Sequence, residues 1–291
     1  MNKTTLQKNV KIANNIMYYI YTHIDVNIDM DELSRNLGIS KFHMHKLFKN
    51  IFEKNIYESI KSIRLQKAAS LLLTNKYSTI SEVASLCGYS SHSSFIKAFR
   101  KKFNVAPKEW RNGAYKKYSD AILKASNIST SSTLDFSTLS ATIVDMPSIK
   151  SYYIRNNGYT DKVKESWQKL YTLILNHKVK KYQMVALLHD NPTITDLNSC
   201  PYIACIVTDE KEDVFTKRLP KFEISDGVYA KFDLQGYGED ILRFIQWIYH
   251  GWLVNSGYET TTKPSFIIYH KNNYLNDDNL FDISYYLSIK F

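Results

Sequence analysis

The chain has 291 residues, and 44% of them are apolar, which is enough to form the cores of two globular domains. Its net charge of +10 is uneven, because the first 120 residues contain 20 Lys/Arg and 9 Asp/Glu while the rest contain 18 and 19. We therefore expect the N-terminal part to bind a polyanion. Three cysteines, no apolar run long enough to cross a bilayer and no N-terminal signal peptide predict a reduced cytoplasmic protein without a membrane partner.

Residues 79–103 predict two short helices that meet at Gly88. Thr79 and Glu82 have the spacing of a capping box, which would start the first helix, and glycine tolerates the positive φ of the turn. In the second helix, phenylalanines at four-residue intervals predict a buried face: Phe95, Phe99 and Phe103. The opposite face is polar and basic, so this segment predicts a helix-turn-helix whose second helix could enter the major groove of DNA.

A second unit of the same kind precedes it. Asp29 is placed to cap a helix that ends at Gly38, 50 residues before Gly88, and Ser40 is placed to cap a second basic helix. The helical pattern at 57–73 predicts a stiff spacer between the two units. Such a spacer could hold two recognition helices about 34 Å apart, the distance between successive major-groove segments. One chain could then read an asymmetric site.

The two units together resemble the AraC/XylS family of bacterial transcription regulators over about residues 8–113. These residues carry the resemblance: Ser40, His43, Phe48, Lys49, Ala84, Gly88, Tyr89, Ser90, Phe95, Phe99, Lys102, Phe103, Pro107 and Arg111. The resemblance implies a regulator that binds double-stranded DNA, more often an activator than a repressor, and that contacts RNA polymerase.

The resemblance also implies roles for single side chains. Base edges would be read by Phe42, His45, Lys46, His92, Ser93, Ser94 and Lys97. DNA phosphates would be bound by Lys49, Arg100, Lys101 and Lys108. Relatives often carry tryptophan at Phe42 and arginine at Lys97, and lysine cannot make the bidentate contact of arginine to guanine. We therefore expect less direct base readout here and more readout of DNA shape.

The composition then changes, because residues 125–140 contain nine Ser/Thr without a clear period. We place a linker at 114–138, between a DNA-binding domain at 1–113 and a second domain at 139–291. In the second domain the order βαββ occurs twice, with strands expected at 141–154, 183–189, 202–208, 227–234, 265–270 and 282–289 and helices at 161–175 and 239–254. The triplets at 157–159 and 235–237 recur 78 residues apart. The sequence thus predicts a multidomain chain, all-α and then α+β, with a groove between two duplicated halves.

This second half resembles the GyrI-like effector-binding domain, which occurs fused to AraC-type readers in regulators of the Rob type. The resemblance covers roughly residues 139–291 and includes Gly158, Trp167, the run HDNP at 189–192, GVYAKF at 227–232 and WLVNSGYE at 252–259. It implies that small, often aromatic and cationic, molecules bind in the groove. Family members that bind cations have a glutamate two residues before the tyrosine at Tyr269, where this chain has Ile267. We therefore expect a neutral apolar or aromatic effector.

The candidate pocket residues are mostly aromatic: Tyr159, Trp167, Tyr229, Trp247, Trp252, Phe266, Ile267 and Tyr269. At least half of them are expected to pack in the core rather than contact a ligand. An interaction module without a ligand stays open as an alternative. A hydrolase is the weaker alternative, because Ile267 replaces the most plausible general base. No catalytic motif stands out, so we expect no enzyme and no cofactor.

A metal site is not expected either. His43 and His45 are two residues apart on a helix, so they point to different faces, and no third ligand has a suitable spacing. Cys200 and Cys205 would point to opposite faces of a strand, which favours structural thiols over a redox pair.

Overall fold

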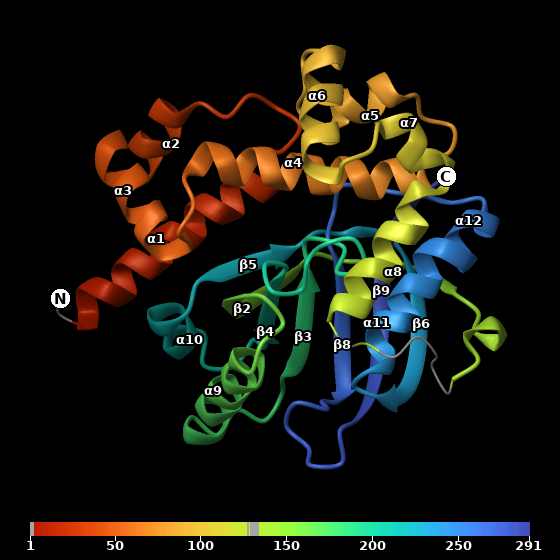
Figure 1. The fold of residues 1–291 in the computed structure, drawn as a ribbon. Coiled ribbons are helices and arrows are strands. Elements are labelled where there is room, and N and C mark those ends of the chain that lie inside the picture. The colour runs from red at the N-terminus through yellow and green to blue at the C-terminus, as the bar shows by residue number, and fades with distance from the viewer. Residues whose placement is uncertain (1–2, 127, 129–133) are drawn as a thin grey trace. The chain divides into compact units, whose positions relative to one another are not determined.

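The computed structural model describes residues 3–126, 128 and 134–291 (Figure 1). These divide into two compact units, one formed by residues 1–72 and 77–109 and the other by residues 73–76 and 110–291. In the part of the chain that the structure describes, no helix is both long and apolar enough to cross a membrane.

The first unit is all helical, as the sequence predicts. Its helices are α1 (Lys3–Thr22), α2 (Met30–Asn36), α3 (Lys41–Phe52), α4 (Ile56–Thr74, whose last two residues belong to the second unit), α5 (Ile80–Leu86), α6 (His92–Phe103) and α7 (Pro107–Glu109). Helices α2 and α3 form one helix-turn-helix, and α5 and α6 form the other. The long helix α4 lies between them in sequence, where the spacer is expected.

Local signals define the second helix-turn-helix. The Glu82 amide donates to Thr79 Oγ1 at 3.1 Å, and the Thr79 amide donates back to the Glu82 carboxylate, which confirms the predicted capping box. Gly88 has φ +71°, and a Cβ there would lie 2.4 Å from the carbonyl oxygen of Ile24. The turn therefore requires glycine for its conformation and for space.

Each recognition helix buries one face, and the buried face of α6 is the predicted one. Helix α3 buries Met44, Leu47, Phe48 and Phe52, and α6 buries Phe95, Phe99 and Phe103. The three rings of α6 contact one another in a row at tilted angles, with successive centroids 5.6 and 4.6 Å apart. Lys102, from the flank of α6, donates through Nζ to the carbonyl and hydroxyl oxygens of Ser62 on α4 at 3.1 and 2.9 Å. These contacts fix the opposite face of α6 as the exposed one.

The second unit is an antiparallel sheet with helices. Its strands are β1 (Thr142–Met146), β2 (Ile149–Asn157), β3 (Gln183–Leu188), β4 (Pro201–Val207), β5 (Lys221–Ile224), β6 (Gly227–Tyr237), β7 (Glu259–Thr260), β8 (Ser265–Lys271) and β9 (Leu280–Lys290). The strand order is β1-β6-β9-β8-β3-β4-β2-β5, and β7 pairs with β9. Its helices are η1 (Trp110–Ala114), α8 (Tyr115–Ala125), η2 (Phe136–Thr138), α9 (Lys162–Asn176), α10 (Glu212–Arg218), α11 (Asp240–Trp247), η3 (Ile248–Trp252) and α12 (Leu253–Ser256).

The predicted duplication is confirmed by the strand order. The first half contributes β2-β4-β3 and the second contributes β6-β9-β8, and the halves meet where β3 pairs with β8. Helix α9 packs on β2 and β4, and α11 packs on β6 (Figure 1). The single strand expected at 141–154 is wrong in detail, because β1 ends at Met146 and β2 begins at Ile149. Pro147 breaks the strand there, since proline lacks the amide N–H that strand pairing uses.

Much of the segment expected to be a linker is ordered. Helix α8 fills residues 115–125 and buries Tyr115, Ser119 and Leu123. It belongs to the second compact unit, which resumes at Trp110. Residues 127 and 129–133 of the expected linker lie outside the described residues. The domain limits 1–113 and 139–291 stay predictions.

Candidate functional site

Helices α3 and α6 each present a polar face opposite their buried face. Of the seven side chains predicted to read bases, six are exposed: Phe42, Lys46, His92, Ser93, Ser94 and Lys97. Phe42 is an unusual surface residue, since 77% of its area is exposed. The seventh residue, His45, is half-buried. An exposed large aromatic side chain at the start of a basic helix suits apolar contact with a thymine methyl group.

Both predicted base-reading histidines contact residues outside their own helices. The ring of His45 stacks on Tyr57 of α4, with centroids 5.6 Å apart and planes 27° apart. His92 Nδ1 lies 3.0 Å from the hydroxyl oxygen of Ser81 on α5, within hydrogen-bond distance. Sequence reasoning missed both Tyr57 and Ser81, because pairing across helices has no local signal.

The four residues predicted to bind phosphates are also exposed: Lys49, Arg100, Lys101 and Lys108. Arg100 and Lys101 lie in the last turn of α6, where cations interact favourably with the helix dipole. Lys102 has another role, because its ammonium group donates to Ser62.

The remaining polar and thiol candidates do not form a chemical centre. Among the described residues, no three His, Cys, Asp or Glu side chains are grouped so that they could hold a metal ion. Burial raises the pKa of the Cys87 and Cys205 thiols to about 12, and Cys200 is shifted in the same direction. Protonated, buried thiols are poor nucleophiles.

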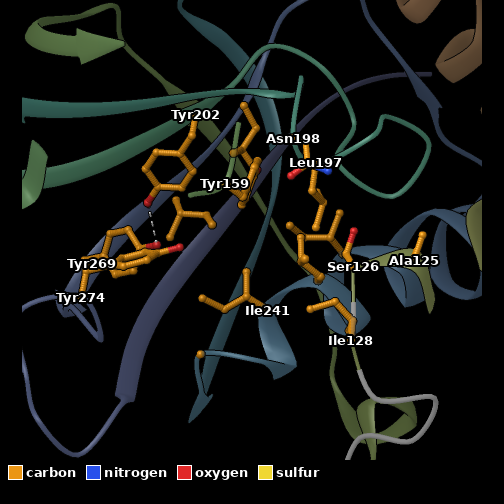
Figure 2. Close-up of a pocket in the computed structure, with 15 residues that line it drawn as sticks. Ala125, Ser126, Ile128, Tyr159, Leu197, Asn198, Tyr202, Ile241, Tyr269 and Tyr274 are labelled. Atoms are coloured by element: carbon orange, nitrogen blue, oxygen red, sulfur yellow. Dashed lines mark hydrogen bonds between the residues drawn. The ribbon is translucent and has the colours of Figure 1, made fainter. Parts of the chain in front are cut away.

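The second unit contains a cavity of about 400 Å³ (Figure 2). Strands β3, β4 and β8, helix α11, the end of α8 and the loop before β4 all contribute to its wall. It is lined by Ala125, Ser126, Ile128, Tyr159, Leu188, Leu197, Asn198, Tyr202, Gly238, Ile241, Leu242, Ile245, Ile267, Tyr269 and Tyr274. In Figure 2 the tyrosines Tyr202, Tyr269 and Tyr274 lie on one side, and Ala125, Ser126 and Ile128 lie on the other.

Three of the eight predicted pocket residues line this cavity: Tyr159, Ile267 and Tyr269. Trp167 lies behind the wall, where its Nε1 donates to the Tyr202 hydroxyl at 3.1 Å and its ring meets Tyr269 edge-on. The tryptophan thus holds two lining tyrosines in place rather than facing the cavity itself.

Phe266 and Tyr229 pack on the other face of the sheet. Successive strand residues point to opposite faces, so Phe266 cannot share the cavity with its neighbour Ile267. Phe266 stacks instead on Tyr286 with centroids 4.5 Å apart, and Tyr229 meets Phe266 edge-on at 5.2 Å. Both side chains are fully buried core residues.

Trp247 and Trp252 also lie outside the cavity. Both meet the buried ring of Phe232 edge-on, at 6.2 and 4.9 Å. Five of the eight predicted residues therefore lie outside this cavity: Trp167, Tyr229 and Phe266 are buried in the core, and Trp247 and Trp252 are half-buried.

The lining residues that sequence reasoning missed are mostly aliphatic. Helix α11 contributes Ile241 and Ile245, one turn apart on its apolar face, and this spacing could have been read from the sequence. Three lining residues at and after the end of α8 could not have been read in this way, because they lie in the Ser/Thr-rich stretch taken for a linker: Ala125, Ser126 and Ile128.

The cavity carries no acidic, basic or histidine side chain among the described residues that line it. Burial raises the pKa of Tyr274 to about 12, and raises those of Tyr159, Tyr202 and Tyr269 further. The four phenols therefore stay neutral at physiological pH. The Tyr202 and Tyr269 hydroxyls lie 3.2 Å apart and share a hydrogen bond.

Polar contacts join α8 to α11, the helix that lines the cavity. Gln246 Nε2 donates to the Ser119 hydroxyl at 3.0 Å and to the Asp120 carboxylate at 2.9 Å. Arg243 Nη1 donates to Gln246 Oε1 at 2.8 Å. Farther along, His250 meets the ring of Tyr115 edge-on at 4.9 Å. Hydrogen bonds and a ring contact thus hold α8 against the rest of the unit that contains the cavity.

A double helix-turn-helix followed by a duplicated sheet with a neutral cavity is the architecture of a DNA-binding transcription regulator with a small-molecule binding domain. Residues 33–113 match the model of a helix-turn-helix domain, and residues 140–290, just over half of the chain, match the GyrI-like small molecule binding domain. The chain belongs to the AraC-type DNA-binding transcription regulators, a non-enzymatic family, and carries a GyrI-like small molecule binding domain.

The curated relatives match about a third of the chain. The chain is 35% identical to the xylose operon regulatory protein of Escherichia coli K12 over 96 residues, which are 33% of this chain and 24% of that protein. It thus spans about a quarter of that relative. The probable transcription factor PqrA of Proteus vulgaris is 30% identical over 102 residues, 34% of this chain and 83% of PqrA. The solved structure of the EcmrR C-terminal domain aligns with 53% of this chain over 98% of its own length, at 16% identity and a TM-score of 0.38.

Proposed function

We propose that this protein is a transcription activator that reads two DNA half-sites with α3 and α6 and responds to a small neutral, apolar or aromatic effector. The exposed face of α6 carries the DNA part of this proposal. His92, Ser93, Ser94 and Lys97 lie in its first two turns, opposite a face buried by phenylalanines. The N-terminal residues of a recognition helix are those that reach base edges in the major groove.

The test of base reading is selection of bound sequences from a random DNA library. Wild type is expected to enrich a bipartite motif whose half-sites lie about one helical turn, roughly 34 Å, apart. The double variant His92→Ala/Lys97→Ala should blur one half-site and keep the other. Absence of any enriched motif with the wild type would contradict sequence-specific reading.

The uncharged cavity supports the effector part of the proposal. Its volume of about 400 Å³ falls within the range of roughly 300–1,000 Å³ that is typical of small-molecule sites. Ile267 lines it where cation-binding relatives have a glutamate. A desolvated cation would find no carboxylate among the described lining residues, whereas an apolar or aromatic molecule would bury its surface favourably.

The neutral dye N-phenyl-1-naphthylamine and the cation tetraphenylphosphonium test this preference. The dye is expected to gain fluorescence with the full chain, and the cation should not displace it. Ile245→Trp, which would fill the cavity, should weaken dye binding at least tenfold. The matched control is Ile143→Trp, at an exposed β1 residue that is 43% accessible. Equal weakening by both variants, or displacement by the cation, would contradict a neutral site.

Helix α8 offers a route from effector to DNA. It follows α7 directly after η1, and its end lines the cavity. An effector that binds one arrangement of α8 better than another would shift the regulator between states. Saturating dye should then change DNA affinity, or transcript output in a reconstituted reaction with RNA polymerase. Activation is tested separately: an activator should raise transcript output when the protein is added without dye. Unchanged affinity and output would rule out this coupling.

A further inference from the structure

The two recognition helices share an arrangement at their histidines. Each histidine lies on the predicted base-reading face, and each touches one side chain from a neighbouring helix. His92 of α6 is held by the Ser81 hydroxyl at 3.0 Å, and His45 of α3 is stacked on Tyr57. Two unrelated kinds of contact thus restrain the same residue type in both helix-turn-helices, at the first residue of α6 and at the fifth residue of α3.

Ser81 is well placed to orient an imidazole. It lies two residues after Thr79, whose capping box fixes the first turn of α5. Its hydroxyl contacts Nδ1 of His92, so Nε2 is the ring nitrogen left for a base. A neutral imidazole has one donor and one acceptor nitrogen, and a hydroxyl can serve either. When Ser81 donates to Nδ1, Nε2 carries the proton and can donate to guanine or thymine. When Ser81 accepts, Nε2 can accept from adenine or cytosine.

Tyr57 restrains His45 through its ring. It is the second residue of α4 and is 58% exposed, yet its ring lies nearly parallel to the imidazole. Stacking of this kind limits side-chain rotation without using either ring nitrogen. This contact uses neither nitrogen of His45.

We propose that Ser81 and Tyr57 are positioning residues that fix the base-reading histidines before DNA binds, and so sharpen sequence discrimination. The proposal rests on base reading by α3 and α6. A side chain held in its bound orientation loses less freedom on binding, so the correct base pair gains more than a wrong one. Neither residue needs to touch DNA for this effect.

The first test compares Ser81→Ala with Ser81→Thr and the matched control Ser85→Ala, an exposed serine on the same helix. Affinities for the selected site and for a site changed at one base pair, the one blurred by His92→Ala, give a discrimination ratio. We expect Ser81→Ala to lower this ratio roughly two- to fivefold, the effect of one modest hydrogen bond. Ser81→Thr, which keeps the hydroxyl, should restore it, and Ser85→Ala should leave it unchanged.

A double-mutant cycle separates positioning from general damage. In a His92→Ala background, Ser81→Ala should have no further effect on the ratio, because the side chain that it orients is gone. The slope of affinity against salt should also stay constant, since no phosphate contact is lost. Additive effects of the two substitutions would overturn the role of Ser81.

Tyr57 is tested in the other half-site. Tyr57→Ala should lower the discrimination ratio at the base pair blurred by His45→Ala by a similar factor, whereas Tyr57→Phe keeps the ring and should keep the ratio. Equal losses with Phe and Ala would assign the effect to the hydroxyl and overturn stacking as its cause. If wild type selects no motif, base reading itself fails and the proposal falls with it. If the motif appears and neither positioning variant changes the ratio, only this inference is wrong.

Discussion

Lys97 and Lys101 lie one turn apart on α6 and are both exposed, so they allow base contact to be separated from phosphate contact on one helix. Lys97→Ala is expected to reduce the free-energy preference for the correct base at one base pair by about 1 kcal/mol. This value is at the low end for specific base contacts, because lysine cannot make the bidentate contact of arginine. Lys101→Ala should weaken all sites alike and reduce the salt slope by about one. Titrations against matched, mismatched and random DNA at several salt concentrations measure both effects. A site-dependent effect of Lys101→Ala would reverse these assignments.

Ile267 gives a test of ligand charge at a single position. Ile267→Glu places a carboxylate in a cavity with no cation among its described lining residues, so the free variant should lose about 2–4 kcal/mol of stability. Tetraphenylphosphonium should then bind at least tenfold more tightly than to wild type and raise the melting temperature. The matched control is Ile267→Gln, which has nearly the same shape and no charge. If Gln and Glu bound the cation equally, charge at this position would not determine the ligand.

His250 predicts a pH dependence of stability. Burial lowers its pKa from 6.5 to about 4, against a smaller raising effect of Asp120. Between pH 6.5 and about pH 4 the unfolded chain binds a proton at His250 that the folded chain does not. The contribution of neutral His250 to folding stability is therefore complete above pH 6.5 and is lost as the pH falls towards 4. The expected loss between pH 8 and pH 5 is about 2 kcal/mol. Urea unfolding at both pH values should show that His250→Phe removes this part of the loss, and an unchanged loss would show that His250 is not its source.

At the scale of elements, the contacts between α8 and α11 predict that ligand binding in the cavity changes the stability of α8. Gln246→Ala removes the donor to Ser119 and Asp120, and we expect it to destabilise the second unit by about 1–2 kcal/mol and to speed amide exchange in residues 115–126. Dye binding should slow this exchange in wild type and less so in the variant. The matched control is Lys169→Ala on α9, whose ion pair with Glu165 is exposed. Equal exchange in wild type and Gln246→Ala would argue against the coupling.

The elements also show how far the sequence predicts this molecule. Caps and turn glycines act locally, so Thr79, Glu82 and Gly88 define the second helix-turn-helix without knowledge of the rest of the chain. The order βαββ, repeated once, likewise predicts the duplicated sheet.

The cavity depends on long-range packing, and prediction was weaker there. An aromatic side chain on a strand can point to either face of the sheet. The helices that pack on the sheet decide which of these faces bears the cavity. This is why Ile267 lines it and Phe266 does not. Helix α8 was not predicted because a Ser/Thr-rich stretch follows it directly. The contacts that hold it, such as the hydrogen bond from Gln246 to Ser119, also join residues far apart in sequence.

At the scale of the whole molecule, the place of α8 bears on how such chains can be cut and recombined. A fragment that starts at residue 140, where the family match begins, would lack Ala125, Ser126 and Ile128 and would open one side of the cavity to water. A fragment that starts at Trp110 would keep them. An exchange of C-terminal domains between regulators would therefore preserve the cavity only if the crossover fell before α8, although the Ser/Thr-rich stretch after α8 looks like the natural place to cut.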